Sequence, residues 1–211
     1  ALVLTAALVF AGNSAIGYMT TGGFIQNYTT NPDGPLALAR TPILLSVTLS
    51  AVVWLIFTWI SGGLSDKIGR RNTYLLGWGI QLVGVIALFP LVNMGTIFSV
   101  TMGLCLLSVG IGMTYGAQSA FYSELYPASI RFSGVSISYA LGAIFGGAFS
   151  PLIASWIVSQ TGGTTYVAVY LATMTLIGFF ATLALRDRTG IPLGPDHEAE
   201  QLKSPLRWHK E

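Results

Sequence analysis

Between two long apolar segments the chain reads Gly62-Gly63-Leu64-Ser65-Asp66-Lys67-Ile68-Gly69-Arg70-Arg71, a ten-residue stretch that holds four charges. The whole sequence is 53% hydrophobic and only 9% charged. Soluble domains carry about 25% charged residues. The composition therefore indicates that most of this chain lies in a lipid bilayer, and that the ten residues form a polar connection between two membrane spans.

Long uncharged stretches predict the spans. Residues 1–32, 41–65, 72–123 and 132–185 contain no Asp, Glu, Lys, Arg or His. A span needs roughly 20 apolar residues, so the first two stretches hold one span each and the last two hold two each. Segments this long satisfy their backbone as helices rather than as barrel strands. We predict an all-α membrane protein in which residues 1–185 form six transmembrane helices, at about 2–26, 41–61, 73–91, 96–120, 132–158 and 166–185.

Basic residues predict the orientation of these spans. Nine of the ten Lys and Arg residues follow span 2, span 4 or span 6, and only Arg40 lies in a loop on the other side. Because cytoplasmic loops carry an excess of Lys and Arg, we expect these three regions to be cytoplasmic in a multi-pass protein of the plasma (inner) membrane. Residues 186–211 are polar, mixed in charge and rich in proline, so we expect a mostly disordered cytoplasmic tail.

The ten-residue stretch has the pattern G-x-x-x-D-x-x-G-R-R. Gly62 and Gly69 permit a close backbone approach and a tight turn, and Asp66 can accept hydrogen bonds from a helix start or from an arginine. Arg70 and Arg71 lie at the membrane boundary, where they anchor span 3. Anchoring alone explains the arginines, but it does not explain the glycines and the aspartate at these spacings.

This pattern resembles the signature loop of the major facilitator superfamily, which lies between the second and third helices of each six-helix half. A second string, E-L-Y-P-x-x-x-R-x-S-G from Glu124 to Gly134, is followed by Y-x-L-G-x-I-x-G-G from Tyr139 to Gly147. It resembles the metabolite:proton symporter family within that superfamily. The resemblance implies one half of a major-facilitator fold, a 3+3 inverted repeat that corresponds to the C-terminal half.

Glu124 and Arg131 are the only charges between spans 4 and 5. From the residues alone, they are either two independently solvated charges or a pair with other partners. The resemblance implies that they pair with Asp66, Arg70 and Arg71 and latch the cytoplasmic side in one state of the transporter. A pair that is partly buried can bias such an equilibrium by a few kcal/mol.

Several polar and aromatic side chains within the spans are candidates for lining a substrate cavity. Span 1 carries a mid-span asparagine, which is costly in lipid unless it meets a partner or a water-filled cavity. Span 2 carries a polar and aromatic stripe, and span 4 ends in a cluster of small residues around a tyrosine. The candidates are Asn13, Tyr18, Thr20, Thr21, Trp54 and Tyr115.

Small residues recur every four positions in span 5. Such a stripe lets helices pack closely, and a smooth face also suits a helix that moves against another half of the transporter. General helix packing is the simpler interpretation. The stripe consists of Gly134, Ser138, Gly142, Gly146 and Ser150.

The spans contain no carboxylate, His, Lys or Arg, which excludes the known constellations of an intramembrane enzyme. We expect no cofactor and no metal, and no basic and aromatic cluster indicates nucleic acid. A transported anion and a coupling proton both need ionisable groups near the membrane centre, so these groups must come from a partner half. The chain begins inside span 1 without a Met, and we therefore expect it to be a piece of a longer protein.

The function that the resemblance implies is secondary transport of a small metabolite, an organic acid or a zwitterion. We expect proton-coupled symport by alternating access, with this chain as the C-terminal half and with the bilayer, an N-terminal six-helix half, the substrate and protons as its partners. Two alternatives remain at this point. One is a truncated membrane protein or scaffold that does not transport, and the other is a facilitator without proton coupling.

Overall fold

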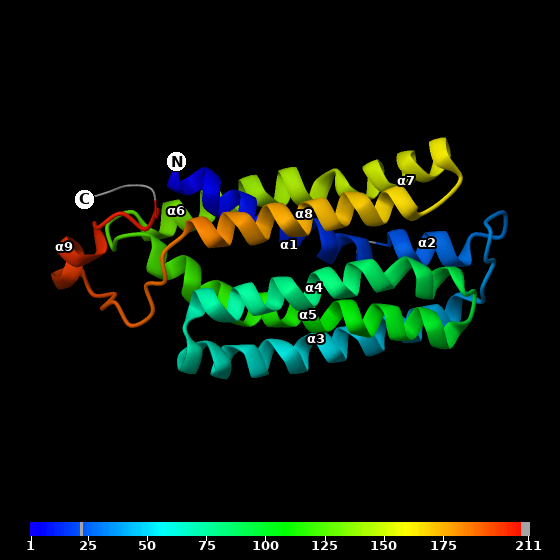
Figure 1. Ribbon diagram of the computed structural model, residues 1–211, viewed down its shortest axis with the longest axis horizontal. Helices are drawn as coiled ribbons and strands as arrows, with labels where there is room; N and C mark the ends of the chain where they lie inside the picture. The colour runs from blue at the N-terminus through cyan, green and yellow to red at the C-terminus, as the bar shows by residue number, and fades with distance from the viewer. Residues whose placement is uncertain (22, 208–211) are drawn as a thin grey trace.

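The computed structural model describes residues 1–21 and 23–207, and within them the chain is almost entirely helical (Figure 1). The helices are α1 (Leu2–Thr21), α2 (Phe24–Thr30), α3 (Arg40–Ile68), α4 (Arg70–Asn93), α5 (Ile97–Leu125), α6 (Arg131–Gly142), the π-helix η1 (Ala143–Ala148), α7 (Ser150–Thr161), α8 (Thr165–Ala184), the 3₁₀-helix η2 (Pro195–His197) and α9 (Glu198–Gln201).

Six helical segments are long and apolar enough to cross a membrane, as the sequence predicts. The first combines α1 and α2, and the fifth combines α6, η1 and α7. Large apolar side chains cover the outside of these segments: Trp59 is 82% exposed and Phe132 is 85% exposed. Water would penalise this surface, whereas lipid does not. The chain is therefore a multi-pass membrane protein.

The helices extend further toward the connections than the sequence indicates. α3 continues through Ile68, so most of the ten-residue stretch is helical and only Gly69 separates α3 from α4. Gly69 has a φ of 95°, a conformation that residues with a side chain rarely adopt. The tight turn predicted for Gly62 and Gly69 therefore lies at Gly69 alone. Gly62 instead faces α5, where the close approach depends on Gly116: a Cβ on Gly116 would lie 3.0 Å from the Gly62 nitrogen, whereas a Cβ on Gly62 would lie 3.9 Å from the Gly116 carbonyl oxygen.

The fifth span is interrupted where the sequence predicts one continuous helix. α6 passes into η1 at Ala143, and α7 begins at Ser150 with Pro151 in its first turn. Proline lacks a backbone N–H, and its ring displaces the carbonyl four residues earlier. The π-helix absorbs this defect without leaving the helical path, and such turns are frequent at functional sites.

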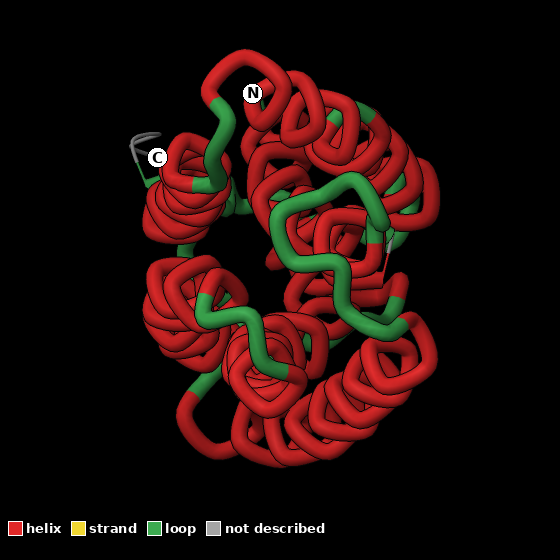
Figure 2. The backbone as a smooth tube through the Cα atoms, turned by 90° about the vertical axis from the view of Figure 1, so that its right-hand side faces the viewer, coloured by secondary structure: helices red, strands yellow, loops and turns green. Residues whose placement is uncertain are grey.

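Most of the helix contacts join a span of the first set of three to a span of the second set. α1 packs against α6 and α8, α5 packs against α3 and α4, and α4 contacts α8. When spans 1–3 are exchanged with spans 4–6, this list of contacts stays the same. The exchange is what an inverted repeat requires, and the end-on view in Figure 2 shows the helices lying side by side along the long axis.

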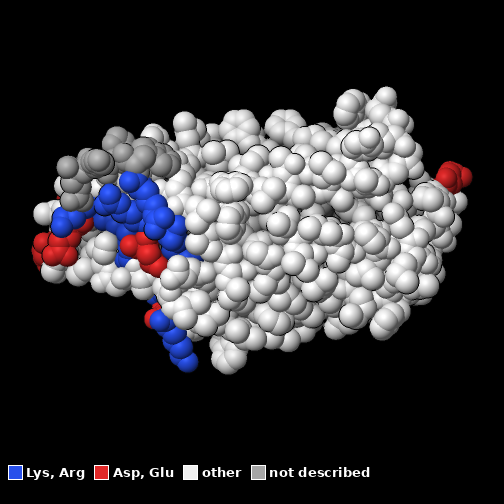
Figure 3. Space-filling model, in the orientation of Figure 1, with Lys and Arg blue, Asp and Glu red and all other residues white. Residues whose placement is uncertain are grey.

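Charged side chains gather at one end of the molecule (Figure 3). We call it the charged end. It contains the α3–α4 turn, the α5–α6 loop and residues 186–207 (Figure 1). Most of the long remaining surface in this view carries no charge, which is the distribution expected for a membrane-spanning body.

The helix packing generates a prediction about Gly146. A Cβ at this position would lie 2.5 Å from Cα of Ala11, so Gly146→Ala should force α1 and η1 apart. Overpacking typically costs about 1–3 kcal/mol, and we expect a clear decrease in the thermal unfolding temperature of the purified protein.

Gly79→Ala is the matched control, because Gly79 is also helical and nothing lies within 4 Å of its added Cβ. This variant should unfold at the original temperature or slightly above it, since alanine reduces the entropy of the unfolded chain. Equal unfolding temperatures for the two variants would show that the contact between α1 and η1 is not tight.

Candidate functional site

Arg70 is the centre of an ion-pair cluster at the charged end. Its Nη1 donates to an oxygen of Asp66 and, over 2.7 Å, to Oγ of Ser65. Its Nε donates over 3.4 Å to Oε1 of Glu124. Arg70 therefore joins the start of α4 to the last turn of α3 on one side and to the last turn of α5 on the other.

The two carboxylates around Arg70 lie in different environments. The side chain of Asp66 is 66% exposed, whereas that of Glu124 is 7% exposed. Surface ion pairs contribute little to stability, but a buried carboxylate depends strongly on its partner. The other carboxylate oxygen of Glu124 is buried and has no hydrogen-bond partner within the described residues. Glu124 is therefore not an independently solvated charge.

Arg71 and Arg131 lie apart from this cluster and bind main-chain carbonyls instead. Arg71 is buried and donates to the carbonyls of Thr182 and Leu183, over 3.4 and 3.1 Å. These carbonyls lie in the last turn of α8, where the carbonyl of Thr182 also accepts from the N–H of Leu185 over 3.2 Å. Arg71 thus anchors α4 to α8.

Arg131 closes the α5–α6 loop. Its Nε donates over 2.9 Å to the carbonyl of Ser123, and its Nη2 donates over 3.1 Å to Oε1 of Gln201. The pairing of Arg131 with Asp66 that the resemblance implies is therefore absent from the described structure. Five residues separate Arg131 from the end of α5 at Leu125, and this short loop keeps the Arg131 guanidinium close to the carbonyls of Ser123 and Tyr126.

Residues 186–207 fold back onto the charged end, where the sequence predicts disorder. The buried Arg188 donates over 2.8 Å to the carbonyl of Gln201, and Gln201 accepts from the N–H of Ala128 over 2.8 Å. Thr189 accepts from the N–H of Arg70 over 2.8 Å. The segment thus contacts both the α3–α4 turn and the α5–α6 loop.

These contacts explain why composition misses the order of the segment. Its proline and mixed charge are typical of a flexible tail, but its polar groups bind carbonyls and N–H groups that the helix ends leave unpaired. Burial lowers the pKa of Arg188 from its ordinary value, while the nearby carboxylate of Glu124 raises it. No periodic pattern in the sequence signals such contacts.

A pocket of about 290 Å³ lies within the span region. Its walls come from α1, α3, α5 and η1, that is, from spans 1, 2, 4 and 5. The ring of Trp54 meets the ring of Tyr115 edge-on at 5.0 Å, and Tyr18 is 48% exposed, so the pocket opens to the surface of this chain. The lining residues are Phe10, Ser14, Gly17, Tyr18, Trp54, Tyr115 and Ala143.

Three of the predicted cavity residues line this pocket, namely Tyr18, Trp54 and Tyr115. Asn13 does not: it is buried, and its side chain makes hydrogen bonds to neighbouring helices. A mid-span amide is stable when its polar atoms have partners, and for Asn13 the partners are protein groups. The side chains of Thr20 and Thr21 lie outside the described part of the structure.

The sequence analysis misses Phe10, Ser14 and Ala143. Ser14 lies one turn and Phe10 two turns before Tyr18, on the same face of α1, because residues four apart share a helix face. Extending the stripe of Tyr18 toward the N-terminus would have found both. Ala143 carries no comparable signal.

The small-residue stripe of span 5 packs within this chain. A Cβ added to Gly142 would lie 2.7 Å from Cβ of Phe10, and a Cβ added to Gly134 would meet the ring of Tyr126. Ser138 shares a hydrogen bond of 2.6 Å with Tyr126, and Ser150 shares one of 2.8 Å with Tyr170. The stripe therefore serves packing against α1, the α5–α6 loop and α8.

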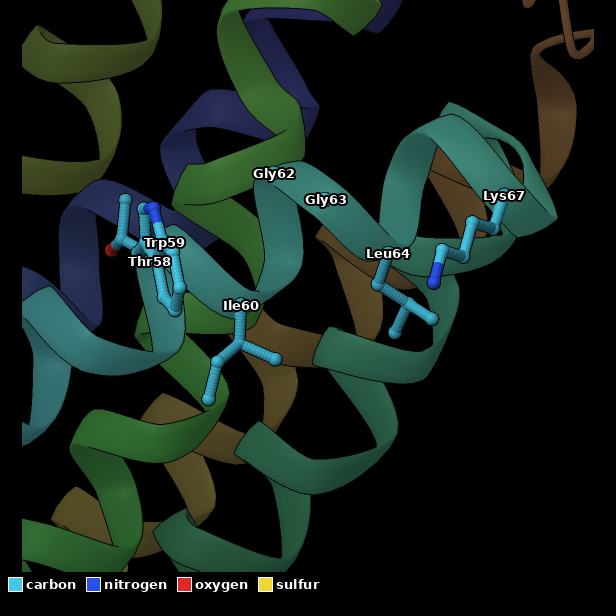
Figure 4. A pocket seen from close by; sticks show the side chains of 7 residues that line it. All are labelled: Thr58, Trp59, Ile60, Gly62, Gly63, Leu64 and Lys67. Carbon is cyan, nitrogen blue, oxygen red and sulfur yellow. The ribbon is translucent and has the colours of Figure 1, made fainter.

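A second hollow, of about 670 Å³, follows the outer side of α3 near the charged end (Figure 4). Figure 4 shows Trp59, Ile60 and Leu64 projecting from α3 around it, with Lys67 at one end. Because its walls are mostly apolar and belong to one helix, this surface suits contact with lipid or with another membrane segment. The polar and aromatic pocket is the better candidate for a substrate.

Comparisons with known proteins give a consistent result. Residues 2–208 match the model of the Major Facilitator Superfamily. The chain is 30% identical over 176 residues to the shikimate transporter of Escherichia coli, an alignment that covers 81% of the chain and 38% of that protein. It is 28% identical over 193 residues to the citrate-proton symporter of Klebsiella pneumoniae, covering 88% of the chain and 43% of that protein.

A solved structure shows the same fold. A crystal structure of the peptide transporter POT aligns with 94% of this chain and 42% of its own chain, with a TM-score of 0.71 and 19% identity. The chain thus spans less than half of each of these proteins. The matches confirm the predicted resemblance, the fold of one six-helix half and the expectation that the family is one of transporters, not enzymes.

The buried pair of Arg70 and Glu124 generates a prediction about stability. Arg70→Met leaves the carboxylate of Glu124 buried without a cation, and removing one partner of a buried pair costs roughly 3–5 kcal/mol. We expect a decrease of about 3 kcal/mol in the free energy of unfolding, measured by thermal unfolding in detergent. Glu124→Gln should cost less, because it removes the charge together with its need for a partner.

The double variant Arg70→Met with Glu124→Gln tests the coupling directly. It should be more stable than Arg70→Met alone, which is the signature of two groups that interact. If the two effects simply add, the pair contributes nothing to stability and Arg70 acts through Asp66.

Proposed function

The chain belongs to the Major Facilitator Superfamily, and on this basis we propose that it forms the C-terminal six-helix half of a secondary transporter. The proposed substrate is a small metabolite with a carboxylate, either an organic acid or a zwitterion. The observation that carries the proposal is the pocket formed by spans 1, 2, 4 and 5, which combines aromatic walls with hydroxyl groups and opens to the surface of this half.

The shape of this pocket supports a site shared between two halves. Transporters of this type bind substrate near the membrane centre, at the interface between repeats, and rock one half against the other. Spans 3 and 6 contribute no residue to the pocket, so they act as the supporting layer. A second six-helix half would close the pocket and provide its other wall.

Neutral side chains alone line the pocket. A carboxylate in a medium of low dielectric constant needs a cation or several hydrogen-bond donors. We propose that the cation and the proton-binding group come from an N-terminal half, and that transport is symport with protons. The similarity to a protein named as a citrate-proton symporter supports this coupling.

The cluster around Arg70 fits a latch that is closed in one state of the cycle. Arg70 belongs to the first set of three spans and Glu124 to the second, so relative movement of α4 and α5 would break their contact. The free energy of one buried pair is large enough to change a two-state population substantially. The gating residues proposed here are Gly62, Asp66, Gly69, Arg70, Arg71, Glu124 and Arg131.

Uptake measurements test the proposed function. Cells that express the complete transporter should accumulate labelled shikimate, citrate or proline, and a protonophore should abolish the accumulation. Purified protein of this chain alone, reconstituted in liposomes under a proton gradient, should accumulate none of them, because residues 1–32, 41–65, 72–123 and 132–185 contain no Asp, Glu or His to bind the coupling proton. Accumulation that a protonophore does not change would indicate a facilitator, and no accumulation at all would favour a scaffold.

The proposed orientation places the charged end in the cytoplasm. In a Cys105→Ala background, an impermeant maleimide should label Met94→Cys on intact cells, since Met94 is 66% exposed in the α4–α5 turn at the opposite end. Lys67→Cys, also exposed but at the charged end, should react only after permeabilisation. The reverse pattern would overturn the orientation.

A further inference from the structure

A network of neutral polar side chains lies beside the pocket and joins four helices. Nδ2 of Asn13 in α1 donates over 2.9 Å to Oε1 of Gln118 in α5 and over 3.3 Å to the hydroxyl of Tyr74 in α4. Tyr74 donates over 2.9 Å to the same oxygen of Gln118. Nε2 of Gln118 donates over 2.8 Å to the hydroxyl oxygen of Tyr139 in α6. Asn13, Tyr74 and Gln118 are buried.

The donors and acceptors of this network follow from the orientation in which the structure places the two amides. Oε1 of Gln118 accepts two bonds, which uses both of its lone pairs, and Nε2 of an amide can only donate. Oδ1 of Asn13 lies 2.8 Å from the hydroxyl of Thr114, and the same hydroxyl lies 2.8 Å from the carbonyl of Ile111. The Tyr139 oxygen therefore accepts from Gln118, and within the described residues its own proton has no acceptor.

Tyr139 lies at the margin of the pocket. Its ring contacts that of Phe10 in a tilted arrangement with centroids 4.4 Å apart, and Phe10 lines the pocket. Ala143, one helical turn beyond Tyr139, lines it as well. The Tyr139 side chain is partly exposed, whereas its neighbours in the network are buried. The network thus ends in a hydroxyl group that has a proton to donate, next to a pocket without cations.

We propose that Tyr139 binds a carboxylate oxygen of the substrate by donating its hydroxyl proton, and that Gln118 is a positioning residue that keeps this proton free. The proposal rests on the proposed function and names a binding residue for it. A hydrogen bond to a charged oxygen is stronger than one between neutral groups, and low polarity strengthens it further. The Tyr139 oxygen already accepts a hydrogen bond from Gln118, so the hydroxyl group is left to act as a donor. The network therefore favours a ligand atom that accepts a hydrogen bond.

Tyr139→Phe tests the binding role. The variant keeps the ring contacts with Phe10 and Tyr122 and removes only the hydroxyl group. Labelled shikimate, citrate and proline serve as probes, each with the corresponding neutral ester at its carboxyl groups, and both uptake and direct binding are measured in the complete transporter. We expect KM and Kd for the accepted acid to rise about tenfold or more, with little change for the ester.

The matched control is Tyr166→Phe, because Tyr166 is 62% exposed at the start of α8 and away from the pocket. This variant should keep the KM and the preference for acid over ester. Gln118→Met tests the positioning role: alone it should raise KM severalfold, and in the Tyr139→Phe background it should have almost no further effect, since both changes remove the same bond.

The outcomes separate this inference from the proposed function. Uptake by the unchanged transporter, with Tyr139→Phe losing affinity for acid and ester equally or for neither, would overturn the inference and leave the function intact. Such a result would also fit the reversed orientation of both amides, in which Tyr139 donates its proton to Gln118. Binding that depends on the hydroxyl, without accumulation, would support the inference and overturn transport. Absence of both binding and uptake for all three probes would overturn both.

Discussion

Lipid offers the backbone no hydrogen-bond partner, so every peptide group within a span has to be satisfied inside the protein. Much of this structure follows from that constraint. α3 and α4 stay helical to within one residue of each other, and only Gly69 can make the change of direction without strain. The fifth span keeps its helical path through a π-helix where Pro151 removes a donor. Close glycine contacts then hold the satisfied helices together, as between Gly116 and Gly62.

The same constraint explains the different fates of the arginines at the charged end. Helix ends leave carbonyls unpaired, and Arg71, Arg131 and Arg188 each bind such carbonyls. Of these four arginines, Arg70 is the one that pairs with two carboxylates among the described residues. A guanidinium has five donors in a planar fork, so it can serve either purpose, and the sequence does not distinguish them. The distinction arises from position: Arg70 follows the one-residue turn directly and reaches α5, whereas Arg71 points toward the end of α8.

This is why the sequence predicts the fold better than the site. Composition and charge-free length define the six spans, because both are properties of the solvent that surrounds the chain. The sequence also allowed the prediction of Tyr18 and of the aromatic pair of Trp54 and Tyr115 as pocket residues, because helical spacing places them on defined helix faces. The environment of Asn13 could not be predicted, because a buried amide and an amide that lines a cavity look alike in sequence until the partners on other helices are known. The contacts of residues 186–207 could not be predicted for a similar reason, since many of their partners are backbone groups, which leave no pattern in the sequence.

The neutral side chains of the spans affect how this half can insert, how its helices can move and how it can bind a substrate. A half without charged side chains in the central part of its spans pays little desolvation penalty for inserting, and its helices can move against one another without exposing a charge to lipid. Charge is then needed in only two places, at the Arg70 cluster that biases the state and in whatever group meets the substrate. Within this chain the proposed second role falls to oriented dipoles: in the row of Asn13, Tyr74, Gln118 and Tyr139, four helices would present one proton to the pocket without burying a charge. The row crosses from α1 to α6, so any movement between these two helices would change both the pocket wall and the direction of the Tyr139 proton. Substrate binding and helix movement would then be linked through one hydrogen bond.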